Sequence, residues 1–541
     1  MKHGLFDRFA RSPFLLPALL LLGAAISVAR GQDAAWDLKN YHLYNAWAFL
    51  NGRLPVDTAA AGLQGYFGPL LDIPYFWLGT GVLKDAPRVL AAFQGLWYGA
   101  TIFVLSRIVL KYTVQRGIPF DWKAAAAVIV GATGTMTLTQ AGMSTNELPL
   151  ALLVLLGFYL VMPLFAGNES AAPLSRVAWA GLLCGAAAGL KPTAIVYAPA
   201  LAFAVWAAYE WRIAGLKLAV VIGLSSFAAF VLTYGVWGWQ LWQLTGNPIF
   251  PMFNQFFHSP WMPPVGGTDR ALMPTSVLQA LFYPFWWLHR NRTQAGNQFA
   301  DPRYALAMVA MLAFAAYHLF GRLTRTTVRA SRTNRLLFVF VATSYVLWLA
   351  LYSILRYAVP IEALTGLILL AGVSEMSSTT SGMAATWRTY LPTAVMVACL
   401  LPIVIMTRYT DWGHAPFGRQ AFDIHPGEIE PGSLVVVLSQ PNAYLAPFLE
   451  NAEGSHFVGI TWLNDLGAGY ELQRRVREDI VSHKGPMYAL LRDDSTAAAA
   501  TLAGYLPGMR FDACHPVVSQ IEQTKRRRDI SEGLRLCKVV R

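Results

Sequence analysis

The chain of 541 residues is poor in charge, because Asp, Glu, Lys and Arg together make up only 13% of it. Soluble domains carry about a quarter of their residues as charge, whereas 55% of this chain is hydrophobic and its mean hydropathy is +0.42. One water-soluble core of this size cannot bury so much apolar surface. The composition therefore excludes an ordinary soluble enzyme and a disordered chain, and it indicates a protein surrounded largely by lipid.

Cysteine is also scarce, and four in such a long chain exclude a disulfide-rich secreted module. Cys184 and Cys399 lie in apolar runs, where packing is the simplest interpretation. Cys514 and Cys537 lie near the C-terminus and can form a disulfide if that part faces an oxidising compartment. The alternative is a pair of reduced, buried thiols.

The sequence also lacks the common short motifs of soluble enzymes. It has no Walker-type Gly-x-x-x-x-Gly-Lys-Ser/Thr loop, no His-Glu-x-x-His or Cys-x-x-Cys metal pair, and no Gly-x-Ser-x-Gly nucleophile turn. The motifs therefore give no support to a nucleotide-dependent, zinc-dependent or serine-hydrolase activity.

What the chain has instead is a series of apolar runs. A membrane-spanning helix needs about 20 apolar residues, and about eleven runs meet or approach this length: 13–29, 87–110, 123–142, 147–165, 177–190, 193–209, 217–238, 303–321, 336–355, 358–374 and 389–407. Two further stretches, 68–83 and 276–288, are short or broken by proline, so we expect re-entrant or interfacial helices there. The predicted fold of residues 1–408 is an α-helical polytopic membrane protein.

The basic residues predict the orientation of these spans. Lys2, Arg8 and Arg11 precede the first span, and five arginines between 322 and 335 fall on the same side in a connection without acids. Lys and Arg concentrate on the cytoplasmic side, so the N-terminus is expected inside and the loops 31–86 and 239–302 outside. The net charge of +12 then reflects the orientation of the spans in the membrane and does not indicate binding of nucleic acid. Alternatively the first span is a cleaved signal peptide, which also leaves the following residues outside.

Residues 409–541 change character, since their apolar runs shorten to the length of strands. Ser433–Ser439 and Leu534–Val540 have strand-like patterns, and helix-compatible runs such as 470–482 lie between them. The sequence therefore predicts a soluble α/β domain on the periplasmic side.

Polar residues near the membrane are costly and often functional, and the first outer loop has two such carboxylates, Asp33 and Asp37. Residues 37–50 have a helical pattern, in which Asp37 is placed as the N-cap and Gly52 as the stop. One interpretation is that Asp37 serves only as this cap. The other interpretation is chemical, because Lys39, His42 and several aromatic residues accompany the two carboxylates.

Three later residues have the same double interpretation. Glu147 begins a helix whose dipole favours an anion, Lys191 precedes Pro192 at a helix break, and Arg356 ends a span. In the structural interpretation, Glu147 only stabilises the start of its helix, and Lys191 only extends its charged group to the membrane surface. Arg356 then only anchors its span at the interface or pairs with Glu362. Their functional interpretation is recognition of an anionic lipid headgroup, since arginine suits phosphate.

Several segments resemble those of one family. Asp37 with Tyr41 and Ala46 is similar to the Asp-acid-x-x-Tyr…Ala start of its first outer loop, although Leu38 replaces the second acid. The other similar segments are Phe67–Trp77, the acidic position Glu147, Gly189–Thr193, Thr245–Pro260 and Arg356–Pro360. The order of these segments along residues 1–410 resembles that of the GT-C superfamily of membrane glycosyltransferases.

The resemblance implies transfer of a single sugar, with inversion, from a polyprenyl-phosphate donor to a hydroxyl at the periplasmic face of a bacterial inner membrane. In this hypothesis Asp37 is the base, Asp33 supports it, and Arg356 and Lys191 bind the phosphate. Further candidates for sugar or acceptor binding are Tyr41, His42, Glu147, Asn254 and His258. The expected partners are membrane lipid, the lipid-linked donor and a glycan, lipid or protein acceptor, with no metal or cofactor and no nucleic acid.

Two other functions fit a polytopic chain. A lipid or sugar transporter or flippase is one, although matching broken helices in two halves are not seen in the sequence. A non-catalytic envelope-assembly protein is the other, but it leaves the outer carboxylates without a task.

Overall fold

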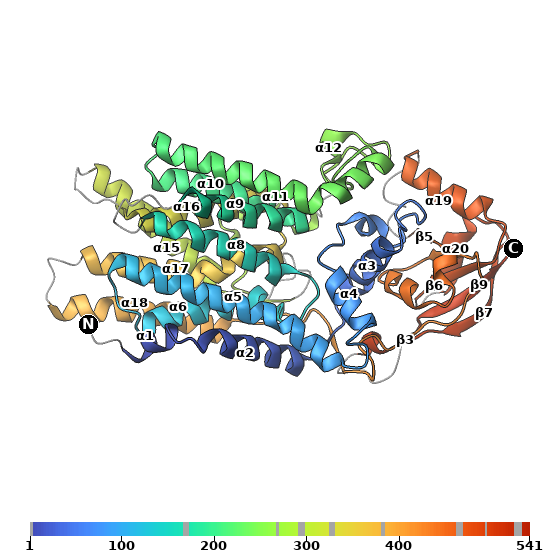
Figure 1. Ribbon diagram of the computed structural model, residues 1–541, viewed down its shortest axis with the longest axis horizontal. Coiled ribbons are helices and arrows are strands. Elements are labelled where there is room, and N and C mark those ends of the chain that lie inside the picture. Colours follow the sequence, from blue (N-terminus) through green and yellow to red (C-terminus); the bar gives the residue numbers. More distant parts are fainter. Residues whose placement is uncertain are drawn as a thin grey trace.

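The computed structural model describes residues 4–165, 173–266, 270–289, 298–323, 330–379, 385–460, 469–492, 495–523 and 533–541. Its long helices run side by side at one end of an elongated molecule, and a β-sheet lies at the other end (Figure 1). Two short helices from the first outer loop, α3 (Leu43–Leu50) and α4 (Ile73–Thr80), lie between these parts.

With one exception, the predicted apolar runs lie on helices of the bundle. These helices are α2 (Leu15–Arg30), α5 (Pro87–Arg116), α6 (Trp122–Ala132), α8 (Glu147–Val161), α9 (Leu174–Leu190), α10 (Tyr197–Ala208), α11 (Ile213–Thr245), α15 (Arg303–Leu323), α16 (Arg332–Leu351), α17 (Val359–Thr379) and α18 (Ala385–Met406). The exception is the run 123–142, which is divided between α6 and a short helix, α7 (Thr135–Thr139), by a break at Thr133 and Gly134. Within the described ranges, six helical segments are long and apolar enough to cross a membrane, and five more are apolar but shorter. The structure supports a multi-pass membrane protein, and the count of eleven spans stays a prediction.

The remaining helices outside the C-terminal part are short. They include α1 (Leu5–Ala10), α7 (Thr135–Thr139), α12 (Asn254–Phe257), α13 (Val277–Leu281) and α14 (Tyr283–Trp286). In the stretches 68–83 and 276–288 the structure has only α4, α13 and α14, none of which has the length of a span.

Small residues let the helices of the bundle approach closely. Gly181, Gly185 and Gly189 recur every fourth residue on α9, and an added Cβ on any of them would overlap atoms of α11. Helices in lipid associate through such small residues, because close backbone contact replaces the missing hydrophobic driving force. The same device joins α2 and α5, where an added Cβ on Gly23 or Gly99 would overlap backbone of the partner helix.

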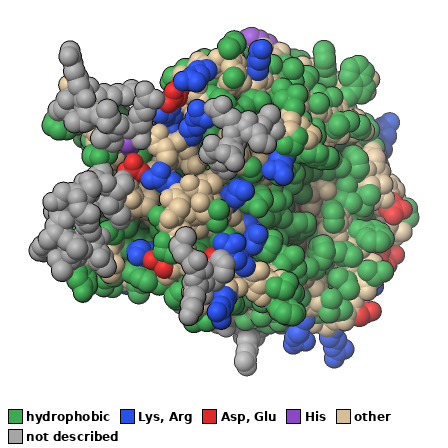
Figure 2. All heavy atoms as spheres, turned by 60° about the vertical axis from the view of Figure 1, so that its left-hand side comes forward, with side chains coloured by type: hydrophobic (Ala, Val, Ile, Leu, Met, Phe, Trp, Pro, Cys, Tyr) green, Lys and Arg blue, Asp and Glu red, His purple; other side chains and the backbone are tan. Residues whose placement is uncertain are grey.

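Basic side chains gather at the end of the bundle that carries α1. Figure 2 shows Lys and Arg there, bordered by the hydrophobic flanks of the helices. Some are paired with acids, for example Arg116 with Glu375 at 2.9 Å and Arg335 with Glu210 at 3.5 Å. The helix α1 with Arg8 also lies at this end, which the sequence predicts to be the cytoplasmic one.

The C-terminal part contains a five-stranded mixed sheet in the order β5-β4-β6-β9-β7. Its strands are β4 (Leu434–Val437), β5 (His456–Gly459), β6 (Met487–Leu491), β7 (Arg510–Pro516) and β9 (Arg535–Val540), and its helices are α19 (Glu471–Ser482) and α20 (Ser495–Ala503). A disulfide between Cys514 and Cys537 joins β7 to β9. The predicted strands 433–439 and 534–540 lie on β4 and β9.

The C-terminal part is attached to the first outer loop by backbone pairing. The two-residue strand β1 (Gln32–Asp33) pairs with β2 (His414–Ala415), and Thr58 forms a parallel bridge with Val458 of β5. A second small pair joins β3 (Ile424–His425) to β8 (Val518–Ser519) within the C-terminal part. The loop thus covers the β5 edge of the sheet, and its position depends on the C-terminal part.

A buried ion pair fixes this attachment. Arg53 pairs with Asp57 at 2.6 Å, and both side chains are at most 5% exposed. Asp57 also accepts hydrogen bonds from Tyr44 Oη at 2.8 Å and from the backbone N–H of Phe457 at 2.9 Å. Arg53 donates to the backbone carbonyls of Glu453 and Ser455. The pair therefore connects the loop to the strand β5 and the residues before it.

We expect Asp57→Asn to weaken this attachment by about 3 kcal/mol, because it leaves a buried arginine without its counter-ion. The measurement is the melting temperature together with the rate at which trypsin cleaves the C-terminal part. Arg474→Gln is the control, since Arg474 forms only exposed pairs on α19 and its loss should change neither quantity. Equal behaviour of the two variants would contradict the role of Asp57.

Candidate functional site

The helix that carries Asp37 contains a π-helical turn at Leu38–His42, directly before α3. Hydrogen bonds in a π-helix join residues five apart, so residues 37, 41 and 42 come to one side. In a regular α-helix of 3.6 residues per turn, residue 42 would point about 140° away from residue 37. Single π-turns are frequent at functional sites. This turn carries Asp37 at its start, beside the charged residues Arg356, Lys191 and Glu147.

Asp37 is not the helix cap that its sequence position suggests. Its backbone is helical, and its side chain makes no capping hydrogen bond. The carboxylate is instead turned to Arg356, whose Nη1 lies 2.6 Å from Oδ2. An ion pair in a buried setting outweighs the smaller gain from capping, so the Asp37 carboxylate faces Arg356.

Arg356 comes from a different part of the fold, a 3-10 turn at Leu355–Ala358 that leads into α17. Its side chain is 15% exposed, and its guanidinium lies over the rings of Tyr357 and Trp412, with centroids 5.7 and 5.6 Å away. Aromatic faces attract such a cation. Trp412 belongs to the start of the C-terminal part, so that part contributes to the surroundings of Arg356.

A second ion pair adjoins the first. Lys191 Nζ lies 2.6 Å from Oε1 of Glu147 and donates to the carbonyl of Thr145 at 2.8 Å. The same Oε1 is 3.9 Å from Nε of Arg356, which makes the four charges one cluster. Glu147 is the first residue of α8 and Lys191 lies at the break between α9 and a 3-10 turn, as the sequence predicts.

The electrostatic balance at Asp37 follows from this arrangement. Burial by itself raises the pKa of the Asp37 carboxyl group, but the electrostatic attraction of Arg356 and Lys191 and the neighbouring His42 outweigh it. The pKa of Asp37 therefore lies below its ordinary value, and Asp37 is ionised at neutral pH.

His42 has its own carboxylate partner. Its Nδ1 lies 2.7 Å from Oδ1 of Asp72, which precedes α4, and Nδ2 of Asn146 donates to the same oxygen at 2.6 Å. Both members of the His42–Asp72 pair are at most 5% exposed. The sequence singles out neither residue, although Asp72 lies within the segment Phe67–Trp77 and Asn146 directly precedes Glu147.

Several polar atoms of this neighbourhood are buried and make no hydrogen bond with the described residues. They are Arg356 Nε, His42 Nε2, Gln140 Nε2 and Ser144 Oγ. Buried polar atoms are nearly always satisfied by protein, water or a ligand. Such a concentration beside two ion pairs is typical of a site that receives a polar ligand.

Two of the predicted loop residues have smaller parts in this geometry. Asp33 accepts hydrogen bonds from the backbone N–H groups of Ala35 at 2.9 Å and Ser144 at 2.7 Å, which occupies both of its oxygens. Tyr41 Oη is 3.5 Å from Asp37 Oδ2, at the limit of a hydrogen bond. Asp33 therefore holds the start of the helix to the loop before α8, and Tyr41 borders Asp37 directly.

No described contact joins the predicted residues Asn254 and His258 to the cluster. The amide nitrogen of Asn254 donates to three carbonyls of its own loop, at Ser259, Met262 and Pro263. His258 is exposed on the surface after α12. Asn254 organises a loop, and an amide in a turn-rich segment cannot be told from a ligand-binding one by sequence.

Glu362, considered in the sequence as a partner of Arg356, has another task. Its carboxylate accepts hydrogen bonds from the backbone N–H groups of Met136 at 3.0 Å and Thr137 at 2.5 Å, at the start of α7. It also accepts one from Tyr304 Oη at 2.8 Å. Since α7 leads into the loop before Glu147, Glu362 helps to position one wall of the cluster.

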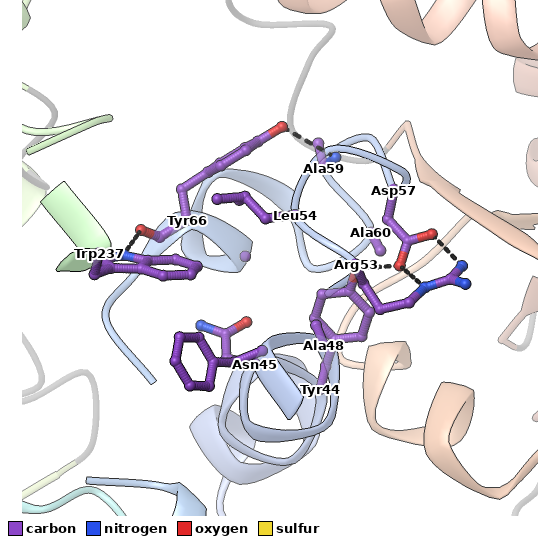
Figure 3. A pocket seen from close by; sticks show the side chains of 12 residues that line it. Tyr44, Asn45, Ala48, Arg53, Leu54, Asp57, Ala59, Ala60, Tyr66 and Trp237 are labelled. Atoms are coloured by element: carbon purple, nitrogen blue, oxygen red, sulfur yellow. Dashed lines mark hydrogen bonds and ion pairs between the residues drawn. The ribbon is translucent and has the colours of Figure 1, made fainter. Parts of the chain in front are cut away.

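A separate cavity lies further along α3. Figure 3 shows it between the Arg53–Asp57 pair and the Tyr66 and Trp237 side chains, with Asn45 at its floor. At about 20 Å³ it has room for one water molecule and not for a sugar. An adjoining groove of about 460 Å³ lies between Phe49, Pro55 and Gln243. Phe49 is twelve residues from Asp37, roughly 18 Å along a helix, so this groove is distinct from the polar cluster.

Within the described ranges there is no group of three His, Cys, Asp or Glu side chains that could hold a metal ion. The cluster is a set of charge pairs in which each carboxylate faces a cation. What it can bind is an anion with hydrogen-bond acceptors, which would compete with Asp37 and Glu147 for Arg356 and Lys191.

No protein-family model matches the chain, and no curated protein matches it. Among solved structures it is similar to ArnT from Cupriavidus metallidurans bound to undecaprenyl phosphate. The similarity covers 97% of each chain, with 13% sequence identity and a TM-score of 0.44. Residue roles do not transfer at this level of similarity, and the function is inferred from the contacts of the cluster.

The Asp37–Arg356 pair predicts non-additive effects on stability. In a double-mutant cycle of Asp37→Asn and Arg356→Gln, we expect a coupling of about 0.5–3 kcal/mol, because each single variant leaves the other charge buried and unpaired. Thermal unfolding in lipid nanodiscs measures it. Asp37→Asn combined with Arg474→Gln is the control and should be additive, and additivity in the first cycle would show that the pair is not formed.

Proposed function

We propose that the protein is a membrane glycosyltransferase that moves one sugar from a polyprenyl-phosphate donor to a hydroxyl group at the outer face of the membrane. The observation that carries this proposal is the meeting of Asp37, from the first outer loop, with Arg356 and Lys191, from much later helix ends, in one buried cluster. A base and two fixed cations are what such a transfer requires.

The proposed reaction breaks the bond between the anomeric carbon and the phosphate oxygen and forms one to the acceptor oxygen. The phosphate keeps the electron pair, and its charge grows from one negative charge in the diester to two in the monoester. Arg356 and Lys191 stabilise this charge where it develops. Asp37 takes the proton that the acceptor hydroxyl loses.

The ion pair gives this chemistry an order. A lipid phosphate that binds Arg356 competes with Asp37 for the same guanidinium. Since the nearby cations lower the pKa of Asp37, loss of that contact raises its pKa and makes it a better proton acceptor. In the proposed cycle, donor binding therefore activates the base.

The location of the polar groups favours surface chemistry over transport. Transporters bind substrate near the middle of the membrane at broken helices, whereas the cluster joins the outer loop to helix ends. The proposed setting is the periplasmic face of a bacterial inner membrane, with the acceptor a glycan, lipid or protein. The solved structure named above contained undecaprenyl phosphate, a lipid of the donor class in this proposal.

Replacement of the proposed base should abolish transfer while donor binding remains. In vesicles that contain the protein and the cell's envelope glycans, supplied with radioactive polyprenyl-phosphate hexoses and pentoses, Asp37→Asn should lower the maximum rate about 10²–10⁴-fold. Arg474→Gln is the control and should transfer at the wild-type rate. Full activity of Asp37→Asn would eliminate Asp37 as the base.

Replacement of the cations should weaken donor binding. We expect Arg356→Gln and Lys191→Gln each to lower the affinity for undecaprenyl phosphate about 10-fold or more, because a charge-assisted hydrogen bond contributes about 1.5–3 kcal/mol. Titration of the purified protein in nanodiscs with this lipid measures the dissociation constant, with the dephosphorylated polyprenol as the comparison ligand. Wild-type affinity in both variants would rule out the phosphate site.

A further inference from the structure

The π-helical turn beside Asp37 carries a further ion pair, which joins it to the C-terminal part. Lys39 Nζ lies 3.3 Å from Oε2 of Glu522, and the two side chains are 15% and 6% exposed. We propose that Lys39 is a positioning residue of the transfer reaction: held by Glu522, it keeps the turn in the form that presents Asp37 to Arg356. This inference rests on the proposed function, in which Asp37 is the base.

Glu522 is a well-fixed anchor for Lys39. It ends the 3-10 turn Gln520–Glu522, which directly follows β8. Each of its two oxygens accepts a hydrogen bond from Arg492 at 2.9 Å, and Tyr444 Oη donates to Oε1 at 2.9 Å. Two parallel bonds from one guanidinium fix the orientation of a carboxylate. The position of Lys39 is therefore set by the C-terminal part.

The two ion pairs hold the turn from opposite sides. Lys39 is two residues beyond Asp37, which is roughly half a turn of a helix, so the two side chains point in nearly opposite directions. Their contacts agree with this direction, because Asp37 faces Arg356 of the bundle and Lys39 faces Glu522 of the C-terminal part. A turn that is held on both sides cannot rotate without breaking one of the pairs.

A π-helical turn depends on such support, because π-helices are rare and the α-helix is the usual form. A π-turn holds one residue more than the α-helical turn it replaces. Its relaxation would therefore rotate Asp37 against α3 by about 100°, the angle of one residue, and turn the carboxylate away from Arg356. Apolar packing acts together with Lys39, since Leu38 is fully buried in a cluster that also contains Ala443 and Ile521 of the C-terminal part.

The Lys39–Glu522 pair should act on the rate of transfer and not on the binding of the donor. A general base works only within hydrogen-bond reach of the proton it takes, and a displacement of about 1 Å can lower a rate about 100-fold. Arg356 and Lys191 lie on other segments of the chain. Since Asp37 competes with the lipid phosphate for Arg356, a loosened turn leaves the affinity for the donor equal or higher.

The test replaces Lys39 by Met, which removes the charge and leaves the Arg492–Glu522 pair in place. In the vesicle transfer assay, Lys39→Met should lower the maximum rate about 10–100-fold, with an equal or lower dissociation constant for undecaprenyl phosphate in nanodiscs. Lys39→Arg keeps the charge and should retain at least half of the wild-type rate. Lys538→Met is the matched control and should behave as wild type, since Lys538 forms an exposed pair with Glu430.

A second measurement is independent of activity. The double-mutant cycle of Asp37→Asn and Arg356→Gln is repeated in Lys39→Met protein, where the coupling should fall to less than half of its value in the wild-type background. The cycle is read by thermal unfolding, so it tests the placement of Asp37 without any substrate. In the Lys538→Met background the coupling should be unchanged.

The outcomes separate this inference from the function it rests on. A wild-type rate or an unchanged coupling in Lys39→Met would overturn the positioning role and leave the proposed function in place. A lower rate with weaker donor affinity, and an equal loss in Lys39→Arg, would assign Lys39 a general structural role and also overturn it. No transfer by the wild type, together with loss of the coupling in Lys39→Met, would overturn the proposed function and still support the placement of Asp37 by Lys39.

Discussion

The arrangement of the site depends on one buried ion pair, Asp37 with Arg356. It joins the first outer loop to the turn before α17, so charges from two segments more than 300 residues apart neutralise each other. A buried pair is costly to form and more costly to break, and the surrounding hydrogen bonds and aromatic rings reduce that cost. Lys191 and Glu147 repeat the arrangement beside it. Four neutralised charges can remain in a low-polarity setting and still exchange partners with an anion.

The C-terminal part belongs to this site more closely than its sequence suggests. Trp412 lies against the guanidinium of Arg356, and Lys39 beside the cluster pairs with Glu522. The Arg53–Asp57 pair and the bridge at Thr58 attach the loop to β5. The helix that carries Asp37 is thereby held from two sides, by the bundle and by the sheet. Rigid support of this kind keeps reactive groups in a fixed geometry.

The cluster also explains why neighbouring side chains are placed as they are. Asp33 and Glu362 satisfy backbone N–H groups at the loop before α8 and at the start of α7. These carboxylates hold the walls, while Asp37 and Glu147 face cations. The carboxylates of this region thus have two roles: some position the backbone, and others are available to a ligand. The hydrogen-bond partner of each carboxylate shows which role it has.

The sequence by itself determined the apolar helices, the break at Lys191, the helix start at Glu147 and the strands β4 and β9, because periodicity, proline and charge act over a few residues. It also singled out Asp37, Arg356 and Lys191, since polar residues at apolar boundaries are costly. Only the tertiary structure decided that Asp37 faces Arg356 instead of capping its helix, that Asn254 serves its own loop, and that Asp72 and Trp412 belong to the site. Those outcomes depend on contacts between segments far apart in the chain, and on a π-helical turn whose cost is recovered only when its side chains meet their distant partners.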